Sequence, residues 1–164
     1  MFRVEEAGQF RGATTFLDLR PNAGFLESGH VEASAGIEAS KLEHQHRATY
    51  AQESATTAAA ANDRVIHVVK GTTGTLKTFS AGCVVANIGN STIDVDLHKN
   101  GVSVLTAAIS IDSGDAAYAI VAGIIDTAAV VADDVLEVVV TVTAGTGTLG
   151  KGVFASLDLW EDVD

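Results

Sequence analysis

The segment that most constrains this fold covers residues 91–112, S-T-I-D-V-D-L-H-K-N-G-V-S-V-L-T-A-A-I-S-I-D. Its Asn100-Gly101 pair is typical of a tight hairpin turn, because both residue types accept the positive φ that such turns require. The residues on either side of this pair are therefore expected to form two antiparallel strands.

Two registers are open for this hairpin. A two-residue turn at Asn100-Gly101 would place Leu105 on the face of Asp94 and Asp96, whereas a three-residue loop over 99–101 places Val95 opposite Leu105. We expect the three-residue loop, because it separates an apolar face from a mostly polar one, and a buried face sets the register. The expected apolar face holds Ile93, Val95, Leu97, Leu105, Ala107, Ile109 and Ile111, and the polar face holds Asp94, Asp96, His98, Thr106, Ser110 and Asp112.

The C-terminal part of the chain reads as a series of short strands separated by Gly, Asn and Asp. The expected strands cover residues 64–70, 75–79, 83–88, 92–98, 102–111, 116–125, 135–143 and 152–160. About eight strands without a helix pattern between them predict a mainly β fold, an antiparallel, jelly-roll-like β-sandwich.

The first sixty residues show no sustained strand or helix pattern. V-E-A-S at 31–34 returns as I-E-A-S at 37–40, and residues 54–62 read as an uncharged linker, S-A-T-T-A-A-A-A-N. A helix over 35–46 is the alternative, although its apolar residues do not share one face. We therefore expect an extended N-terminal arm and linker over 1–62 and the β-sandwich domain over 63–164.

Charge and composition exclude several classes of function. The formal net charge is −11 and no basic run occurs, so the chain is not expected to bind nucleic acid. No apolar stretch approaches the length of a membrane span, so no membrane association is expected. Cys83 is the only cysteine, which excludes an intrachain disulfide, and its apolar surroundings predict a small buried side chain rather than a reactive thiol.

No motif predicts catalysis or cofactor binding. G-T-G-T-L-G at 145–150 fits a nucleotide-binding fingerprint, but a strand follows it where that fingerprint needs a helix, so a hairpin loop is expected. Asp94, Asp96 and His98 share one strand face and could bind a cation or act as acid and base. A solvated outer face is the interpretation that we favour, because alternating polar residues on the outer side of a sheet need no function. We expect no enzyme, no catalytic residue and no cofactor.

His44 and His46 are the candidates for a metal site. Their i, i+2 spacing places both imidazoles on one face of an extended chain, and in a three-fold assembly six nitrogens could surround one ion on the axis. Ordinary polar contacts are the alternative that we favour, so no metal is predicted.

Apolar residues on outward-facing positions suggest self-association. Phe154 and Trp160 face outward if the last strand buries Val153 and Leu157, and Val135 and Val139 face outward on the preceding strand. These four residues are candidates for an oligomer interface.

Three segments resemble proteins of tailed bacteriophages. D-L-H-K-N-G-V-S-V-L at 96–105 and A-D-D-V-L-E-V-V-V-T-V at 132–142, with a glycine-rich turn into a final strand, resemble virion jelly-roll domains. Capsid decoration (cement) proteins and head-fibre proteins are the nearest type. G-I-E-A-S-K-L at 36–42 is similar to the I-x-x-x-K-L segments of phage fibre-like trimers.

The resemblance implies a structural virion protein, made in the host cytoplasm and located on the capsid surface. It would be a homotrimer whose N-terminal arm binds the major capsid protein and stabilises the head. The arm residues expected to contact the capsid are Phe16, Leu17, Phe25, Leu26, Val31, Ile37, Leu42 and Tyr50. A tail-fibre or receptor-binding module, with aromatic side chains in its loops, is the alternative. A small β-sandwich hydrolase, with convergent carboxylates in a pocket, is a further one.

Overall fold

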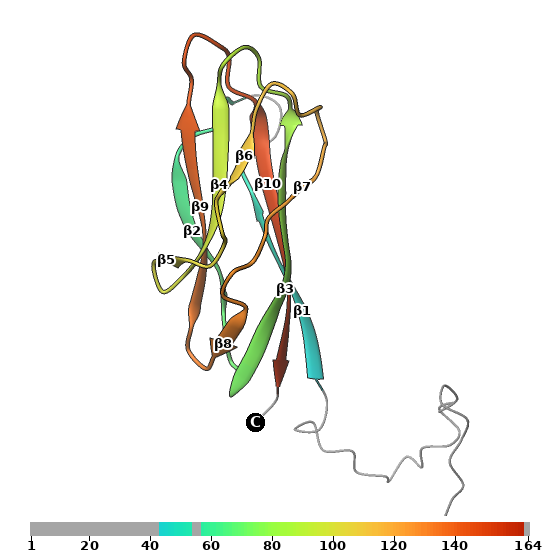
Figure 1. Ribbon diagram of the computed structural model, residues 1–164, viewed down its shortest axis with the longest axis vertical. Helices are drawn as coiled ribbons and strands as arrows, with labels where there is room; N and C mark the ends of the chain where they lie inside the picture. The colour runs from blue at the N-terminus through green and yellow to red at the C-terminus, as the bar shows by residue number, and fades with distance from the viewer. Residues whose placement is uncertain (1–42, 54–56, 163–164) are drawn as a thin grey trace, which may run out of the picture. The chain divides into compact units, whose positions relative to one another are not determined.

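The computed structural model of the chain describes residues 43–53 and 57–162, which form ten β-strands (Figure 1). The strands are β1 (Glu43–Ala51), β2 (Asn62–Val68), β3 (Thr73–Val85), β4 (Thr92–Lys99), β5 (Val102–Ser103), β6 (Ile109–Ile111), β7 (Val121–Ala122), β8 (Ala129–Val131), β9 (Val135–Thr143) and β10 (Lys151–Asp162). The described residues contain no helix long and apolar enough to cross a membrane.

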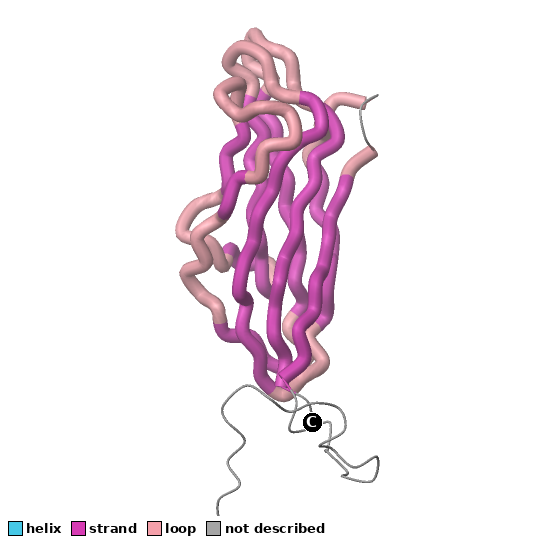
Figure 2. The backbone as a smooth tube through the Cα atoms, turned by 90° about the vertical axis from the view of Figure 1, so that its right-hand side faces the viewer, coloured by secondary structure: helices cyan, strands magenta, loops and turns pink. Residues whose placement is uncertain are grey.

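The strands form two antiparallel sheets that lie face to face (Figure 2). The first sheet has the order β1-β10-β3-β7, with β8 also paired to β3, and the second has the order β2-β9-β4-β5, with β6 also paired to β4. β1 and β2, β3 and β4, and β9 and β10 follow one another in the chain but belong to opposite sheets. This winding of a double ribbon is that of a jelly roll. The predicted antiparallel β-sandwich is therefore confirmed.

Alternation along the long strands builds the core between the sheets. Ile93, Val95 and Leu97 of β4 are fully buried, and the residues between them face outward. Leu136 and Val138 of β9 face the core in the same way. Complete burial of one such aliphatic side chain contributes about 1.5–3 kcal/mol, so this alternation holds the two sheets together.

The hairpin at Asn100-Gly101 has a two-residue turn, and the expected three-residue loop is wrong. Lys99 pairs with Val102, and φ is 52° at Asn100 and 79° at Gly101, as in a type I′ turn. The expected apolar face is nevertheless buried except at Ala107, which is exposed.

This face stays buried despite the shorter turn because residues 104–108, between β5 and β6, do not pair with β4. Val104 N donates to Leu97 O over 2.9 Å, and Leu105 forms a bridge with Ile125 instead of pairing with β4. Pairing resumes with Val95 opposite Ile109. The excursion turns Leu105 into the core although the turn is one residue shorter than expected.

The expected boundary at 62/63 is also wrong, because β1 belongs to the sandwich. β1 pairs with β10 over its whole length, and its Ala48 and Tyr50 are buried. Ala59 is buried too and its N–H donates to Gly150 O over 2.8 Å, so residues 57–61 pack against the sandwich between β1 and β2. The alternative, a helix over residues 35–46, is wrong for residues 43–46, because these belong to β1.

Candidate functional site

A cleft of about 240 Å³ opens where β1 and β2, the terminal strands of the two sheets, lie next to each other. Its lining consists of polar and charged side chains and one glycine: His44, His46, His67, Lys70, Gly71, Glu161 and Asp162. We refer to it as the histidine cleft. It brings together residues of β1 and β2 with residues of β10, which is far from them in the sequence.

β1 supplies the first two imidazoles. His44 and His46 share one face of the strand, as their spacing predicts, and their ring centroids are 6.3 Å apart. Ala48 and Tyr50 continue the same face into the core. Both histidines therefore lie on the inner side of β1, where the sandwich opens to solvent.

β2, which belongs to the sheet opposite β1, supplies the third imidazole. Its pairing with β9 shifts between Val65 and His67, so that His67 is opposite the buried Leu136 and faces inward. The ring centroid of His67 lies 5.6 Å from that of His46. The irregular register thus places a β2 imidazole against a β1 imidazole.

Glu161 of β10 forms the inner wall of the cleft and is only 4% exposed. Its carboxylate is hydrogen-bonded to Nε2 of His67, and its Oε2 accepts from Lys70 N at 2.8 Å and from Gly71 N at 2.7 Å. Burial disfavours its ionised form, but these three hydrogen bonds together lower the pKa of Glu161 below its ordinary value. A buried, fixed carboxylate is the result.

Gly71 is required for this arrangement. A Cβ built on Gly71 would lie 2.2 Å from Asp162 O, so no larger residue fits beside the end of β10. The close approach lets the N–H of Gly71 reach the Glu161 carboxylate. Sequence reasoning missed Glu161, although the alternation of Leu157 and Leu159 on β10 extends to it.

The side chains of the histidine cleft are of types that can bind a cation or exchange protons. Three imidazoles and one carboxylate can ligate a transition metal or share protons, and no serine or cysteine nucleophile lines the cleft. Within residues 43–53 and 57–162, no three His, Cys, Asp or Glu side chains are placed so that they could hold a metal ion.

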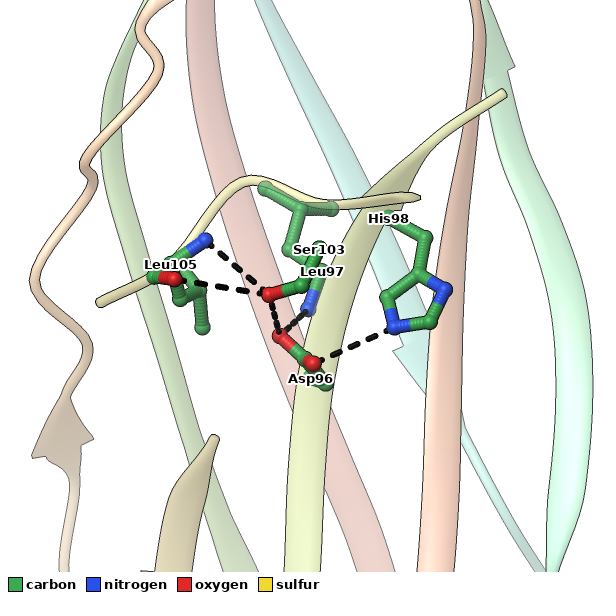
Figure 3. A network of polar contacts seen from close by, with 5 residues as sticks. All are labelled: Asp96, Leu97, His98, Ser103 and Leu105. Atoms are coloured by element: carbon green, nitrogen blue, oxygen red, sulfur yellow. Dashed lines mark hydrogen bonds and ion pairs between the residues drawn. The ribbon is translucent and has the colours of Figure 1, made fainter. Parts of the chain in front are cut away.

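The second polar cluster, at Asp96 and His98, braces the hairpin (Figure 3). The Asp96 carboxylate accepts from Leu97 N at 2.8 Å, from Ser103 Oγ at 2.9 Å and from His98 Nε2 at 3.1 Å. Asp94 lies on the same outer face, opposite Ser110 and Thr141. The hydrogen bonds of Asp96 thus join β4 to β5 and give the cluster a structural role.

The four interface candidates do not form one surface. Val135 and Val139 lie on the outer face of the sheet of β9, and Phe154 and Trp160 lie on the outer face of the other sheet. All four side chains are half-buried. The Nζ atom of Lys77 lies over the Trp160 ring, 3.8 Å from the ring centroid. Their role in an oligomer stays a prediction.

A more exposed apolar surface lies on residues 116–125, A-A-Y-A-I-V-A-G-I-I, which we call the apolar strip. Tyr118, Ile120 and Ile124 are 68%, 71% and 70% exposed, and the strip carries no charged residue. It follows the edge of β3, where Tyr118 N donates to Cys83 O and Gly123 N donates to Phe79 O. Only its two-residue strand β7 pairs with β3, so the expected strand over 116–125 is mostly absent.

Most of the expected arm residues lie outside the described part of the chain: Phe16, Leu17, Phe25, Leu26, Val31, Ile37 and Leu42. The exception is Tyr50, for which the expectation is wrong. Tyr50 is 3% exposed on the inner face of β1, and its hydroxyl accepts from Gln52 Nε2 at 2.9 Å. It packs in the core and is not available to a capsid.

The prediction for Cys83 is confirmed. Cys83 is 1% exposed, and burial raises the pKa of its thiol, as expected of a core side chain. Residues 144–150 form the loop between β9 and β10, and a strand follows the glycines as expected, but the two strands belong to opposite sheets, so the expected hairpin loop is wrong and the loop connects the sheets. No protein-family model matches this sequence, and no curated protein matches it either.

Proposed function

We propose that this chain is a structural virion protein of a tailed bacteriophage, a capsid decoration protein that binds the outer capsid surface. The jelly roll is a fold that viral capsid proteins use repeatedly, although it also serves lectins and enzymes. The observation that carries the proposal is the apolar strip, because a protein that works alone in solution rarely leaves such a surface uncovered.

The position of the apolar strip suits contact between copies of this chain. With a formal net charge of −11, two copies repel each other over most of their surface, but residues 116–125 carry no charge. The strip also lies at the border of its sheet, beyond β3, where the last strands are the short β7 and β8. A homotrimer formed through this edge would bury Tyr118, Ile120 and Ile124.

The arm of the proposal is shorter than the sequence suggested. Because β1 begins at Glu43 and supplies core residues, only the residues before it remain for attachment to the major capsid protein. Three linked arms on one trimer would bind a preformed surface by multivalency, so each arm needs only modest affinity.

One observation favours the alternative of a receptor-binding module. Tyr118 is an aromatic residue in a loop, it is 68% exposed, and its φ of 63° is unusual for a non-glycine residue. Exposed loop aromatics are typical of carbohydrate-binding surfaces. A fibre would carry few copies per particle, whereas a decoration protein would cover the capsid.

Truncation tests the role of the arm. A variant that begins at Glu43 keeps every described strand, so it should fold, yet it should no longer bind capsids of the phage that encodes the chain. Cosedimentation of purified capsids with the full-length and truncated proteins measures this binding. Attachment of the truncated protein at full-length affinity would contradict an arm-mediated function.

A further inference from the structure

We propose that the histidine cleft is a Zn²⁺ site in which His44, His46 and His67 of one chain are the protein ligands. Imidazole nitrogens suit Zn²⁺, Cu²⁺ and Ni²⁺, and three protein ligands with one open position are common around zinc. This inference is independent of the proposed virion function, since it concerns residues within one sandwich.

The separations of His46 from His44 and from His67 are slightly longer than those between ligands of a tetrahedral metal site. With Zn–N bonds of about 2.0–2.1 Å, ring centroids lie about 3.2 Å from the ion and about 5 Å from each other in tetrahedral geometry. The centroids of His46 and His67 are 5.6 Å apart, and those of His44 and His46 are 6.3 Å apart. Both separations exceed the tetrahedral one by roughly 0.5–1.5 Å, so side-chain rotations of His44 and His46 are needed to bring these rings to a common ion with His67.

Two of these rings have room for such rotations. His44 is exposed and His46 is half-buried, and both line a cleft of about 240 Å³. The volume of the cleft exceeds the roughly 30 Å³ that one water molecule takes up in the liquid, so an ion and its remaining water ligand can enter. The backbone of β1 does not need to move, because its pairing with β10 already holds both residues on one face.

His67 already has the second partner that a metal-binding histidine needs. Metal-ligating histidines commonly donate their other ring N–H to a carboxylate, which fixes the tautomer and raises ligand basicity. Nε2 of His67 is hydrogen-bonded to Glu161, which leaves Nδ1 for an ion. Glu161 itself is held by the N–H groups of Lys70 and Gly71, so this carboxylate is a preformed support for His67.

The ion would connect the two sheets at their edges. His44 and His46 come from β1 of one sheet and His67 comes from β2 of the other. An ion bound by residues of both sheets would stabilise the folded state by an amount that grows with the logarithm of the Zn²⁺ concentration above its dissociation constant, because the unfolded chain lacks the site. Zn²⁺ at a hundred times its dissociation constant should raise the melting temperature by roughly 5–10 °C.

The test is calorimetric titration of the metal-free, full-length protein with ZnCl₂ at pH 7.5, with MgCl₂ as the hard-cation comparison. We expect one Zn²⁺ per chain with a dissociation constant of about 10 μM or lower, and no Mg²⁺ binding. His46→Gln and His67→Ala should each weaken Zn²⁺ binding at least about tenfold, and Glu161→Gln should weaken it by about tenfold through His67.

His98→Ala is the matched control. His98 resembles His67 in side-chain exposure, 23% against 22%, and in having a carboxylate partner, but it lies on the outer face of β4. Its removal should leave zinc affinity unchanged within about twofold. Circular dichroism of each variant must show the wild-type strand signal, and Co²⁺ absorption spectra give a second readout of tetrahedral coordination.

Three results would overturn the inference. These are a dissociation constant above about 1 mM, equal losses in the His67 and His98 variants, or one Zn²⁺ per three chains with no effect of His67→Ala. The last result would place the ion on a symmetry axis with His44 and His46 alone.

Discussion

The side-chain amide of Asn100 donates a hydrogen bond to the Asp134 carboxylate over 2.7 Å, and this contact joins the turn after β4 to the turn before β9. Oδ1 of Asn100 accepts from Val135 N at 2.8 Å, and Oδ2 of Asp134 accepts from Val131 N at 2.9 Å. Asn100 therefore serves two purposes, since it also adopts the positive φ of the type I′ turn.

Removing either partner should destabilise the sandwich by about 1–3 kcal/mol, because the other partner and the N–H of Val135 or Val131 lose a hydrogen bond. Urea unfolding of Asn100→Ala, Asp134→Ala and the double variant measures this loss. In the double variant we expect a smaller loss than the sum of the single losses, as for directly coupled residues. Strict additivity would show that the two side chains act independently.

Gly101→Val should cost about 1–3 kcal/mol of unfolding free energy, because a β-branched residue is strained at positive φ. φ is 79° at Gly101, and no atom lies within 4 Å of a Cβ built there, so backbone strain is the whole effect. Gly101→Asn is the control, since Asn tolerates positive φ, and it should lose less stability. Equal losses in the two variants would contradict this explanation.

Asp134 should make stability depend on pH in the acid range. The hydrogen bond from Val131 N is the largest cause that lowers the pKa of Asp134, burial opposes it, and the Asn100 amide and the Lys99 charge add to the lowering. A lowered pKa stabilises the folded state above the ordinary value of 3.8, and that contribution disappears as the pH falls below it. The difference in unfolding free energy between wild type and Asp134→Asn should therefore shrink from pH 7 to pH 3. A constant difference would exclude this linkage.

The sequence was sufficient for the fold class because local signals agreed with tertiary structure. The Asn-Gly pair, the alternation of Ile93, Val95 and Leu97, and the turn residues all indicated the same antiparallel sandwich. The hairpin register could not be predicted from local sequence. It depends on Leu105 forming a bridge with Ile125, a residue of a distant segment, instead of pairing with β4.

The histidine cleft was only half predictable. The spacing of His44 and His46 indicated a shared face, but His67 faces inward because of an irregular register in β2, which no local pattern announces. β1 itself was missed because its inner face begins with two polar residues before Ala48 and Tyr50. Where the inner face of a strand carries polar residues, its sequence lacks the apolar alternation of a strand and cannot be distinguished from that of an exposed arm.

Ile120→Glu combined with Ile124→Glu should convert the proposed trimer into monomers. Two carboxylates in the apolar strip would have to be desolvated at the contact, in a chain that is already strongly acidic. Sedimentation equilibrium measures the change in mass. Val102→Glu, at a side chain 69% exposed on β5 of the other sheet, is the control and should remain trimeric. If only the control variant lost the trimer, the interface would instead lie on the sheet that contains β5 and β9.

The most direct test of the proposed virion function is the copy number of this chain in purified particles of the proposed phage. Quantitative mass spectrometry gives the ratio of this chain to the major capsid protein. If the chain is a decoration protein, its copy number should be close to a simple fraction of that of the major capsid protein. This means many copies per head. A few copies per particle would support the fibre alternative. Complete absence from purified particles would contradict the account.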